Sequence, residues 1–383
     1  MFRLKFYAAT FALVIGLLAT FNQTARAESW SWENLFSFGS SENAAAVCTT
    51  NPVVVNVLNS GAGSLRQAVI DACADSTITF NASMPPEVSL TTGQIVIDKN
   101  LTIAGPGANR LTVRNGASDR IFQVNNGVTA IISGLTIEDG TNGGISNAGT
   151  LTVADCVVRS NKGSGIGSSG NLTVVNSVLS DNHAGAGGAI YNSGTAAITN
   201  STILHNSAGT GGGIYNGVSG SSVTITNSSI TGNIATGETI LIGFESYTTI
   251  WGSAISNRNG SVTITNSTIA GNEDQGFTNE NCFFSPNRVC PPGYETAILM
   301  LIAEQGEPFP GGELNLINST VTDNILRRTT FNNGFPSVIR ARNSIINGLT
   351  ASGGSTELNS QGYNLLVNPS NAFTGDTTGN ILG

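Results

Sequence analysis

The sequence predicts an all-β fold, a single-stranded right-handed parallel β-helix of about ten coils, from three observations. First, one short phrase recurs along the chain, most clearly as AITNSTI at 197–203, VTITNSSI at 223–230 and VTITNSTI at 262–269. Second, apolar residues alternate with Thr, Ser or Asn within each copy, which is the period of a strand with one buried face. Third, the spacing inside a copy is constant while the distance between copies varies. Copies this short cannot bury an apolar face alone, so they must stack.

An Asn or a polar substitute stands at the same place in each copy, and a second Asn often follows it six residues later. In stacked coils such residues exchange amide hydrogen bonds with the coils above and below, and they tolerate the left-handed backbone of a sharp corner. We therefore expect a structural ladder in vertical register, at buried corners, and neither ligands nor glycosylation acceptors. The ladder residues are Asn176, Asn200, Asn227, Asn266, Asn318 and Asn343.

The start of the chain is typical of a secretory signal peptide at 1–27. Arg3 and Lys5 precede an apolar run at 8–19, and small residues at Ala25 and Ala27 form the cleavage pattern. The apolar run is too short to favour a membrane-spanning helix. The sequence thus predicts an exported protein, either secreted or held at the cell surface.

Charge excludes two classes of partner. The chain has 16 basic and 24 acidic residues; residues 1–27 hold three basic and no acidic ones, which leaves 13 against 24 and a formal charge of −11. An acidic surface repels phosphate backbones and anionic lipids. The sequence therefore argues against nucleic-acid binding and membrane insertion, and we expect a monomer.

The domain plan follows the repeats. Residues 28–47 form a linker or N-terminal arm, 48–93 an N-terminal cap, 94–342 the parallel β-helix with insertions at 234–252 and 273–312, and 343–383 the C-terminal coils and tail. Ser64 and Gln67 form a capping-box pattern, and an apolar stripe follows, so 64–73 is predicted to be a short amphipathic helix. Such a helix covers the open end of the first coil.

The five cysteines divide into two predicted disulfides and one thiol. Cys282 and Cys290 lie in a Pro-containing loop and are expected to close it in an exported protein. Cys48 and Cys73 are expected to join the arm to the cap helix. Cys156 takes the Ser position of its coil and is predicted to be a buried, inert thiol.

Several of these segments resemble known bacterial proteins. The stretches 58–68 and 101–109, together with the GGIYN and TNSTI units, resemble right-handed parallel β-helix proteins of the polymorphic outer membrane protein-like type. The end of the chain, from 343–346 through 360–366, is similar to the choice-of-anchor Q region that such proteins carry. The resemblance implies the fold and leaves the activity open, because one fold hosts many functions.

An aromatic column is the first candidate binding site. Tyr191 and Tyr215 each follow an inward-pointing Ile, so they point outward and stack one coil apart, with Ser146 and Gly167 below them and Trp251 close by in the first insertion. Exposed aromatic rings suit the apolar faces of sugars. Plain stacking along a sheet face is the alternative.

Catalytic candidates are few. A polysaccharide lyase needs a base, and Lys162, His183 and His205 lie at corresponding corners of consecutive coils. A glycoside hydrolase needs two carboxylates at a defined separation, but Glu138 and Asp139 have no counterpart on an adjacent coil. The sequence predicts no metal site and no cofactor, with Ca²⁺ considered only for a lyase, since the calcium-binding repeat is absent.

The sequence therefore predicts a secreted or cell-surface binding or adhesion module that recognises glycans or other surface ligands. The alternative is a polysaccharide lyase or glycoside hydrolase whose groove lies beside the two insertions. A third possibility, a structural spacer, predicts neither turnover nor glycan binding.

Overall fold

The chain forms two units, Met1–Val47 and Cys48–Gly383. The computed structural model describes residues of the second unit, and the expected signal peptide, the arm at 28–47, Trp251, Cys282 and Cys290 lie outside the described residues. The described ranges are 48–116, 119–218, 220–242, 245–249, 252–258, 260–274, 297–302, 313–322, 325–328, 337–347, 356–362, 364–367, 374–376 and 380–382.

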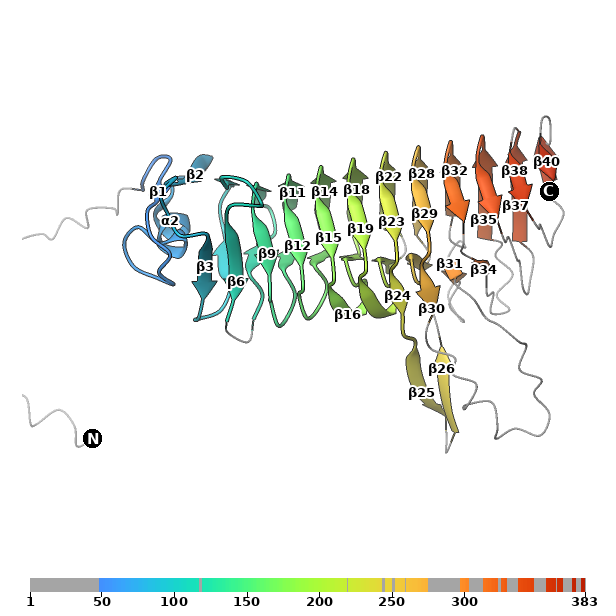
Figure 1. Cartoon of the computed structure of the whole chain (residues 1–383), viewed down its shortest axis with the longest axis horizontal. Coiled ribbons are helices and arrows are strands. Elements are labelled where there is room, and N and C mark those ends of the chain that lie inside the picture. Colours follow the sequence, from blue (N-terminus) through green and yellow to red (C-terminus); the bar gives the residue numbers. More distant parts are fainter. Residues whose placement is uncertain are drawn as a thin grey trace, which may run out of the picture. The chain divides into compact units, whose positions relative to one another are not determined.

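The second unit is a right-handed parallel β-helix of about nine turns, which confirms the predicted fold class (Figure 1). The chain returns to the same sheet once per turn, so strands that are neighbours in space are far apart in sequence. The first sheet has the described strands β1 (Val53–Val54), β2 (Ser76–Phe80), β5 (Leu101–Ala104), β8 (Thr129–Ser133), β11 (Thr150–Ala154), β14 (Asn171–Val175), β18 (Thr195–Thr199), β22 (Ser222–Thr226), β28 (Ser261–Thr265), β32 (Glu313–Ile317), β35 (Ser337–Arg342), β37 (Thr356–Gln361) and β39 (Thr374–Asp376).

Two further long sheets complete each turn. The second sheet has β3 (Glu87–Leu90), β6 (Thr112–Asn115), β9 (Thr136–Glu138), β12 (Val157–Arg159), β15 (Val178–Ser180), β19 (Thr202–Leu204), β23 (Ser229–Thr231), β29 (Thr268–Ala270), β33 (Thr320–Thr322), β36 (Ile345–Asn347), β38 (Leu365–Val367) and β40 (Ile381–Leu382). The third sheet has β4 (Ile95–Ile97), β7 (Phe122–Val124), β10 (Ile145–Asn147), β13 (Ile166–Ser168), β17 (Ile190–Asn192), β21 (Ile214–Asn216), β27 (Ile255–Arg258), β31 (Ala297–Ile302) and β34 (Ile325–Arg328).

A fourth, short sheet and a hairpin belong to the middle coils. The fourth sheet has β16 (His183–Ala186), β20 (Ser207–Thr210), β24 (Ile234–Ala235) and β30 (Glu273–Asp274), and β25 (Glu238–Ile242) pairs antiparallel with β26 (Glu245–Thr249). Because β24 and β30 are paired, both expected insertions begin at the same angular position. The second insertion is shorter than 273–312, since Ala297–Ile302 pairs in parallel with β27 and is a regular coil strand. The sequence of that strand, AILMLI, has none of the Asn and Thr residues of the repeated phrase, so the repeat pattern did not predict it.

The register stays constant while the coil length changes. Asn171 pairs with Thr195, and Thr195 pairs with Ser222, so these coils differ in length by three residues (24 against 27) and the pairing continues through all five strand positions. The additional residues leave the frame through the turns. The turns can therefore vary while the strand faces keep their columns.

The core consists of aliphatic columns that run from coil to coil. Ile137, Val158 and Leu179 are consecutive in the second sheet and fully buried. Ile166, Ile190 and Ile214 form the corresponding column of the third sheet, also fully buried. Burying each such side chain contributes about 1.5–3 kcal/mol, and this burial fixes which face of each strand points outward.

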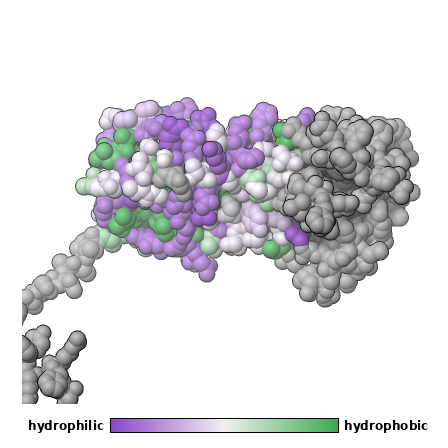
Figure 2. Space-filling view, turned by 90° about the horizontal axis from the view of Figure 1, so that it is seen from below, coloured by the Kyte–Doolittle hydropathy of each residue, from purple (hydrophilic) through white to green (hydrophobic). Residues whose placement is uncertain are grey.

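A short helix covers the first coils. Ser64 caps α2 (Leu65–Asp71) by accepting a hydrogen bond from the Gln67 N–H, and Leu65, Ala68 and Val69 are buried. Cys48 and Cys73, 25 residues apart, form a disulfide that ties the start of the unit to the end of this helix. Four of the nine large exposed hydrophobic residues in the described part of the chain lie in this cap, where Figure 2 shows green patches: Val53, Val55, Leu58 and Ile70.

The expected Asn ladder is exposed, not buried. Asn200 donates to Asn176 Oδ1 at 3.4 Å, and Asn227 donates to Asn200 Oδ1 at 3.3 Å. The same contact continues through Asn266, Asn318 and Asn343 at 3.1–3.3 Å. All six residues have φ near 50°, the left-handed region that an Asn tolerates better than most residues. These Asn residues therefore form the corners of the coils while their side chains point to solvent.

The second Asn of each pair forms the buried ladder. Asn182 donates to Asn206 Oδ1 at 2.8 Å and to the Val158 carbonyl at 3.0 Å, while its own Oδ1 accepts from the backbone and side-chain N–H groups of Asn161. Each of these side chains is at most 1% exposed. Both amide hydrogens and the amide oxygen are therefore satisfied without water. A third amide column, Asn192, Asn216 and Asn257, is buried at the end of the third sheet.

A hydroxyl column occupies the position after the exposed Asn. The Ser201 hydroxyl accepts from the Ser177 N–H at 3.1 Å and donates back to the Thr199 carbonyl at 2.8 Å, and the pattern repeats in neighbouring coils. Cys156 stands in this column, and its N–H donates to the Ser177 hydroxyl. The thiol is free and buried, and burial raises its pKa to about 11. It is therefore protonated and inert at neutral pH.

Candidate functional site

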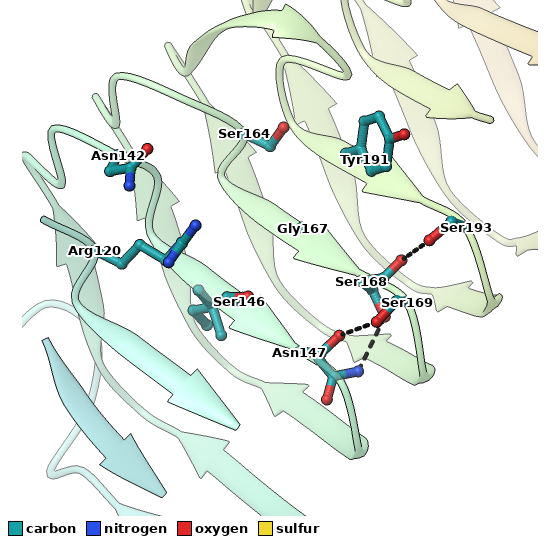
Figure 3. A pocket seen from close by; sticks show the side chains of 11 residues that line it. Arg120, Asn142, Ser146, Asn147, Ser164, Gly167, Ser168, Ser169, Tyr191 and Ser193 are labelled. Carbon is teal, nitrogen blue, oxygen red and sulfur yellow. Dashed lines mark hydrogen bonds between the residues drawn. The ribbon is translucent and has the colours of Figure 1, made fainter. Parts of the chain in front are cut away.

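A hollow of about 280 Å³ lies on the outer face of the third sheet, across β10, β13 and β17. Figure 3 shows Arg120 and Asn142 toward one end, Ser146 and Gly167 in the middle, and Tyr191 at the other end. We call this hollow the Tyr191 groove. Its lining residues are Arg120, Asn142, Ile145, Ser146, Asn147, Ser164, Gly167, Ser168, Ser169, Tyr191 and Ser193.

The groove exists because the outward column of the third sheet changes size. Ser146 pairs with Gly167, and Gly167 pairs with Tyr191, so two small residues precede a large one. A Cβ added at Gly167 would meet no atom within 4 Å. The space beside the Tyr191 ring on this side is therefore open.

Tyr191 has one covered face. Its ring centroid is 5.2 Å from that of Tyr215, which pairs with it in the next strand, and the planes are inclined by 31°. Tyr191 is 36% exposed. Tyr215, which we expected to be exposed as well, is only 8% exposed, and its hydroxyl accepts from Arg258 at 3.5 Å. Tyr215 therefore supports Tyr191 from behind, and the free face of Tyr191 looks over Gly167.

Polar groups line the two long sides of the groove. On one side the hydroxyls of Ser169 and Ser193 donate to carbonyls of the preceding coil, those of Asn147 and Ser168. On the other side Ser164 donates to the Ala186 carbonyl at 3.0 Å. These hydroxyl oxygens can still accept a hydrogen bond from a ligand. Within the described part of the chain, the Ser146 hydroxyl and the Asn142 amide have no partner, so they can donate as well.

Arg120 supplies the positive charge of the groove. The guanidinium has no ion pair or hydrogen bond to any residue that the structure describes. The neighbouring Asp119 carboxylate makes no ion pair with this guanidinium and accepts hydrogen bonds from the backbone N–H groups of Arg120 at 2.8 Å and Gln94 at 3.4 Å. Arg120 was not among the residues that the sequence suggested, since it lies in a turn outside the repeated phrase.

The structure brings together two of the three catalytic candidates. Lys162 bridges to His183 on the next coil, and His183 pairs in turn with Ser207, whose hydroxyl lies 2.7 Å from His183 Nδ1. His205 is two residues before Ser207, at a left-handed corner with φ 54°. It therefore belongs to a different column from Lys162 and His183. None of the three lines the Tyr191 groove.

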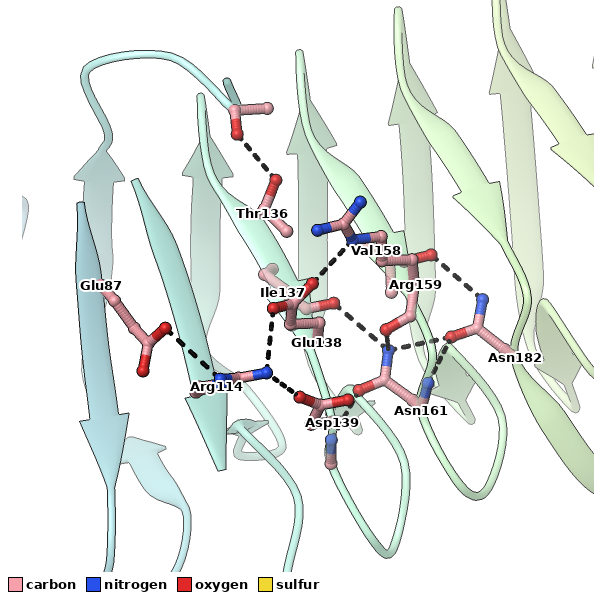
Figure 4. Close-up of polar contacts among 12 residues, drawn as sticks. Glu87, Arg114, Thr136, Ile137, Glu138, Asp139, Val158, Arg159, Asn161 and Asn182 are labelled. Atoms are coloured by element: carbon pink, nitrogen blue, oxygen red, sulfur yellow. Dashed lines mark hydrogen bonds and ion pairs between the residues drawn. The ribbon is translucent and has the colours of Figure 1, made fainter. Parts of the chain in front are cut away.

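The carboxylates of the second sheet are neutralised by arginines (Figure 4). Glu138 lies between Arg114 and Arg159 in one column and contacts them at 3.4 Å and 2.6 Å. Arg114 also pairs with Glu87 and Asp139, and the hydrogen bond that it donates to Asp139 is the main cause that raises the pKa of Arg114. A paired carboxylate of this kind stabilises the sheet face and is a poor general acid or base.

The described residues offer neither a metal-binding cluster nor a helix that could span a membrane. Across these ranges, no three His, Cys, Asp or Glu side chains gather closely enough to hold a metal ion. Nor does any helix in the described part of the chain have the length and apolar character that crossing a bilayer requires.

Some solved structures resemble this chain in part. No family model and no curated protein matches the chain. Pectate lyase Pel9A has 16% identity and a TM-score of 0.49, and the match covers 80% of this chain and 78% of that one. ORF18 of Geobacillus virus E2 has 12% identity and a TM-score of 0.36, with coverage of 86% of this chain and 60% of that one. The A-module of the Azotobacter vinelandii mannuronan C-5 epimerase AlgE4 has 11% identity and a TM-score of 0.27, with coverage of 81% of this chain and 89% of that one. At this level of identity the activities named belong to those proteins, and the site described above depends on this chain's own residues.

Proposed function

We propose that this protein is a glycan-binding module that holds an oligosaccharide in the Tyr191 groove. The observation that carries the proposal is the Tyr191 ring, which is supported by Tyr215 on one face and open over Gly167 on the other. An aromatic ring presented in this way matches the apolar face of a sugar, and the hydroxyls and amide along the groove match its polar edge.

The composition of the groove favours binding over turnover. Arg120 and Tyr191 are the titratable side chains among its lining residues. Acid and base catalysis by a positioned side chain requires a pKa near the working pH, whereas a guanidinium stays protonated. The groove therefore offers stacking, hydrogen bonds and one fixed charge, which are the components of recognition.

Export belongs to the same proposal. The signal peptide at 1–27 predicts secretion or cell-surface exposure, and the Cys48–Cys73 disulfide supports an oxidising compartment. We also propose the finer family assignment, polymorphic outer membrane protein-like with a choice-of-anchor Q region, a monomeric state, and no role for nucleic acid. The sequence also suggested a second class of partner, a surface ligand that is not a glycan.

The test combines a glycan array with calorimetry on the purified full-length protein. Tyr191→Ala should weaken the affinity for the bound glycan about tenfold, whereas Tyr191→Phe keeps the ring and should bind as wild type does. Gly167→Leu should abolish binding, because it fills the open space without a clash and at a φ outside the left-handed region.

Gly185→Leu is the matched control for the filled groove. Gly185 lies in β16 with nothing within 4 Å of an added Cβ, and it does not line the groove. This variant should bind normally. Binding that survives Gly167→Leu, or the absence of any glycan ligand, would refute the proposed function.

A lyase is the second candidate, and the backbone pairing that places Lys162 beside His183 on adjacent coils favours it. Turnover of uronate polymers, followed by the absorbance of the unsaturated product, is the measurement. Turnover that disappears in Lys162→Ala or His183→Ala would replace the binding proposal, and Ca²⁺ would then be tested as an additive.

A further inference from the structure

We propose that the ligand of the Tyr191 groove is an acidic oligosaccharide, with an anionic group paired to Arg120 while another sugar of the same chain stacks on Tyr191. This inference rests on the proposed function and specifies its ligand. Three features of the groove support it: the free guanidinium, the distance between Arg120 and Tyr191, and the lack of negative charge among the lining residues.

The guanidinium of Arg120 differs from those arginines of the coils that protein groups hold in place. Arg66 donates to the Gly93 and Gln94 carbonyls at 2.6 Å, and Arg114 and Arg159 pair with Glu138. Arg120 is only partly exposed, yet no described residue receives its hydrogen bonds. A guanidinium presents paired N–H donors that match a carboxylate or a sulfate in a bidentate contact. Its natural partner is therefore an anion supplied by the ligand.

The neighbouring acidic residue does not take that place. Asp119 is adjacent in sequence, but its two oxygens are used by backbone N–H groups of Arg120 and Gln94. No Asp or Glu is among the lining residues of the groove. An anionic ligand therefore meets no like charge in the groove, although the whole chain carries a formal charge of −8.

The spacing of the strands favours a ligand of several linked sugars. Arg120 precedes β7, and Tyr191 lies in β17, three strand steps further along the third sheet. At about 4.8 Å per step these strands are on the order of 14 Å apart. Because the two side chains come from strands this far apart, we take them to contact separate sugars of one ligand. The oligosaccharide therefore runs across the strands, along the helix axis, and passes Ser146 and Gly167 (Figure 3).

The experiment compares ligands that differ only in charge. We would titrate the full-length protein with a galacturonate oligomer, with its methyl ester and with a sulfated oligosaccharide of equal length. Wild type should bind the uronate about tenfold more tightly than the ester, because the neutral ester cannot make the charge-assisted contact with Arg120. Tight binding of the sulfated chain in place of the uronate would identify sulfate as the anion.

Arg120→Gln identifies the residue responsible. This variant should bind the acidic oligomer no more tightly than wild type binds the ester, and its affinity for the ester should not change. Arg110→Gln removes the same charge from an exposed position outside the groove, so it should keep the preference. Arg120→Lys should recover part of the preference for the acidic oligomer, since an ammonium keeps the positive charge and cannot form the bidentate contact.

The outcomes separate this inference from the proposed function. Equal binding of charged and neutral oligomers, unchanged in Arg120→Gln, would overturn the inference and leave the glycan groove intact. The same conclusion follows if neutral glycans alone bind. Failure of every glycan, charged or neutral, would overturn the proposed function itself.

Discussion

Replacing Asn206 by Ala tests whether the buried amide ladder holds the coils together. Asn206 Oδ1 accepts from Asn182 twice, from the backbone N–H at 3.1 Å and from the side-chain amide at 2.8 Å. Asn206 Nδ2 also donates to the carbonyls of Leu179 and Leu204. Asn182 and Asn206 are both 0% exposed, so water cannot replace the lost acceptor. Two buried donors without a partner, at about 1–3 kcal/mol each, predict a loss of about 4 kcal/mol of unfolding free energy.

Asn200→Gly, in the same turn of the helix, is the matched control. Asn200 has φ 50° and is exposed, and among the described residues its side chain makes only the 3.3–3.4 Å contacts of the outer ladder. Gly134, with φ 61°, occupies the corresponding corner of an earlier coil, so a glycine is accommodated there. We expect a change of about 0.5 kcal/mol or less. Urea unfolding followed by circular dichroism compares the variants, and an Asn206→Ala variant as stable as Asn200→Gly would refute the reasoning.

The remaining predictions concern the cysteines. Cys156→Ser should change the unfolding free energy by less than about 1 kcal/mol, because the Ser hydroxyls of the same column already donate to the carbonyl two residues earlier; a larger loss in thermal unfolding would contradict this. Cys156 should resist alkylation at neutral pH until the protein unfolds, since burial raises its pKa to about 11, and mass spectrometry after iodoacetamide treatment measures it. Replacing both Cys48 and Cys73 by Ala should cost about 3 kcal/mol through the 25-residue separation they close, and a variant as stable as wild type would count against that role.

The repeats predicted the coil frame because each copy specifies its own register. Alternation at period two decides which residues face inward, and the Asn positions place the corners, so the vertical order of Ser146, Gly167, Tyr191 and Tyr215 could be read from the text. The burial of Tyr215 could not be read, since it depends on what covers the outer face of the coil. The exposure of the first Asn column was also missed, because spacing alone does not say which way a left-handed corner directs its side chain.

The groove itself was only half predictable. Tyr191 belongs to the repeated phrase, whereas Arg120 and Asn142 come from turns, where sequence varies and no periodicity applies. One available signal was missed: Asn142 and Ser164 occupy the turns that lead into β10 and β13, and both are short polar side chains. Polar turn residues in consecutive coils, beside an aromatic column, would have marked this edge of the groove.

The most direct measurement of the central claim is a crystal structure of the full-length protein with a bound acidic oligosaccharide. The account predicts density for a sugar ring above Gly167, against the free face of Tyr191, with an anionic group at the Arg120 guanidinium and the chain running across β10 and β13. An oligosaccharide bound beside Lys162 and His183, with the Tyr191 groove empty, would contradict it.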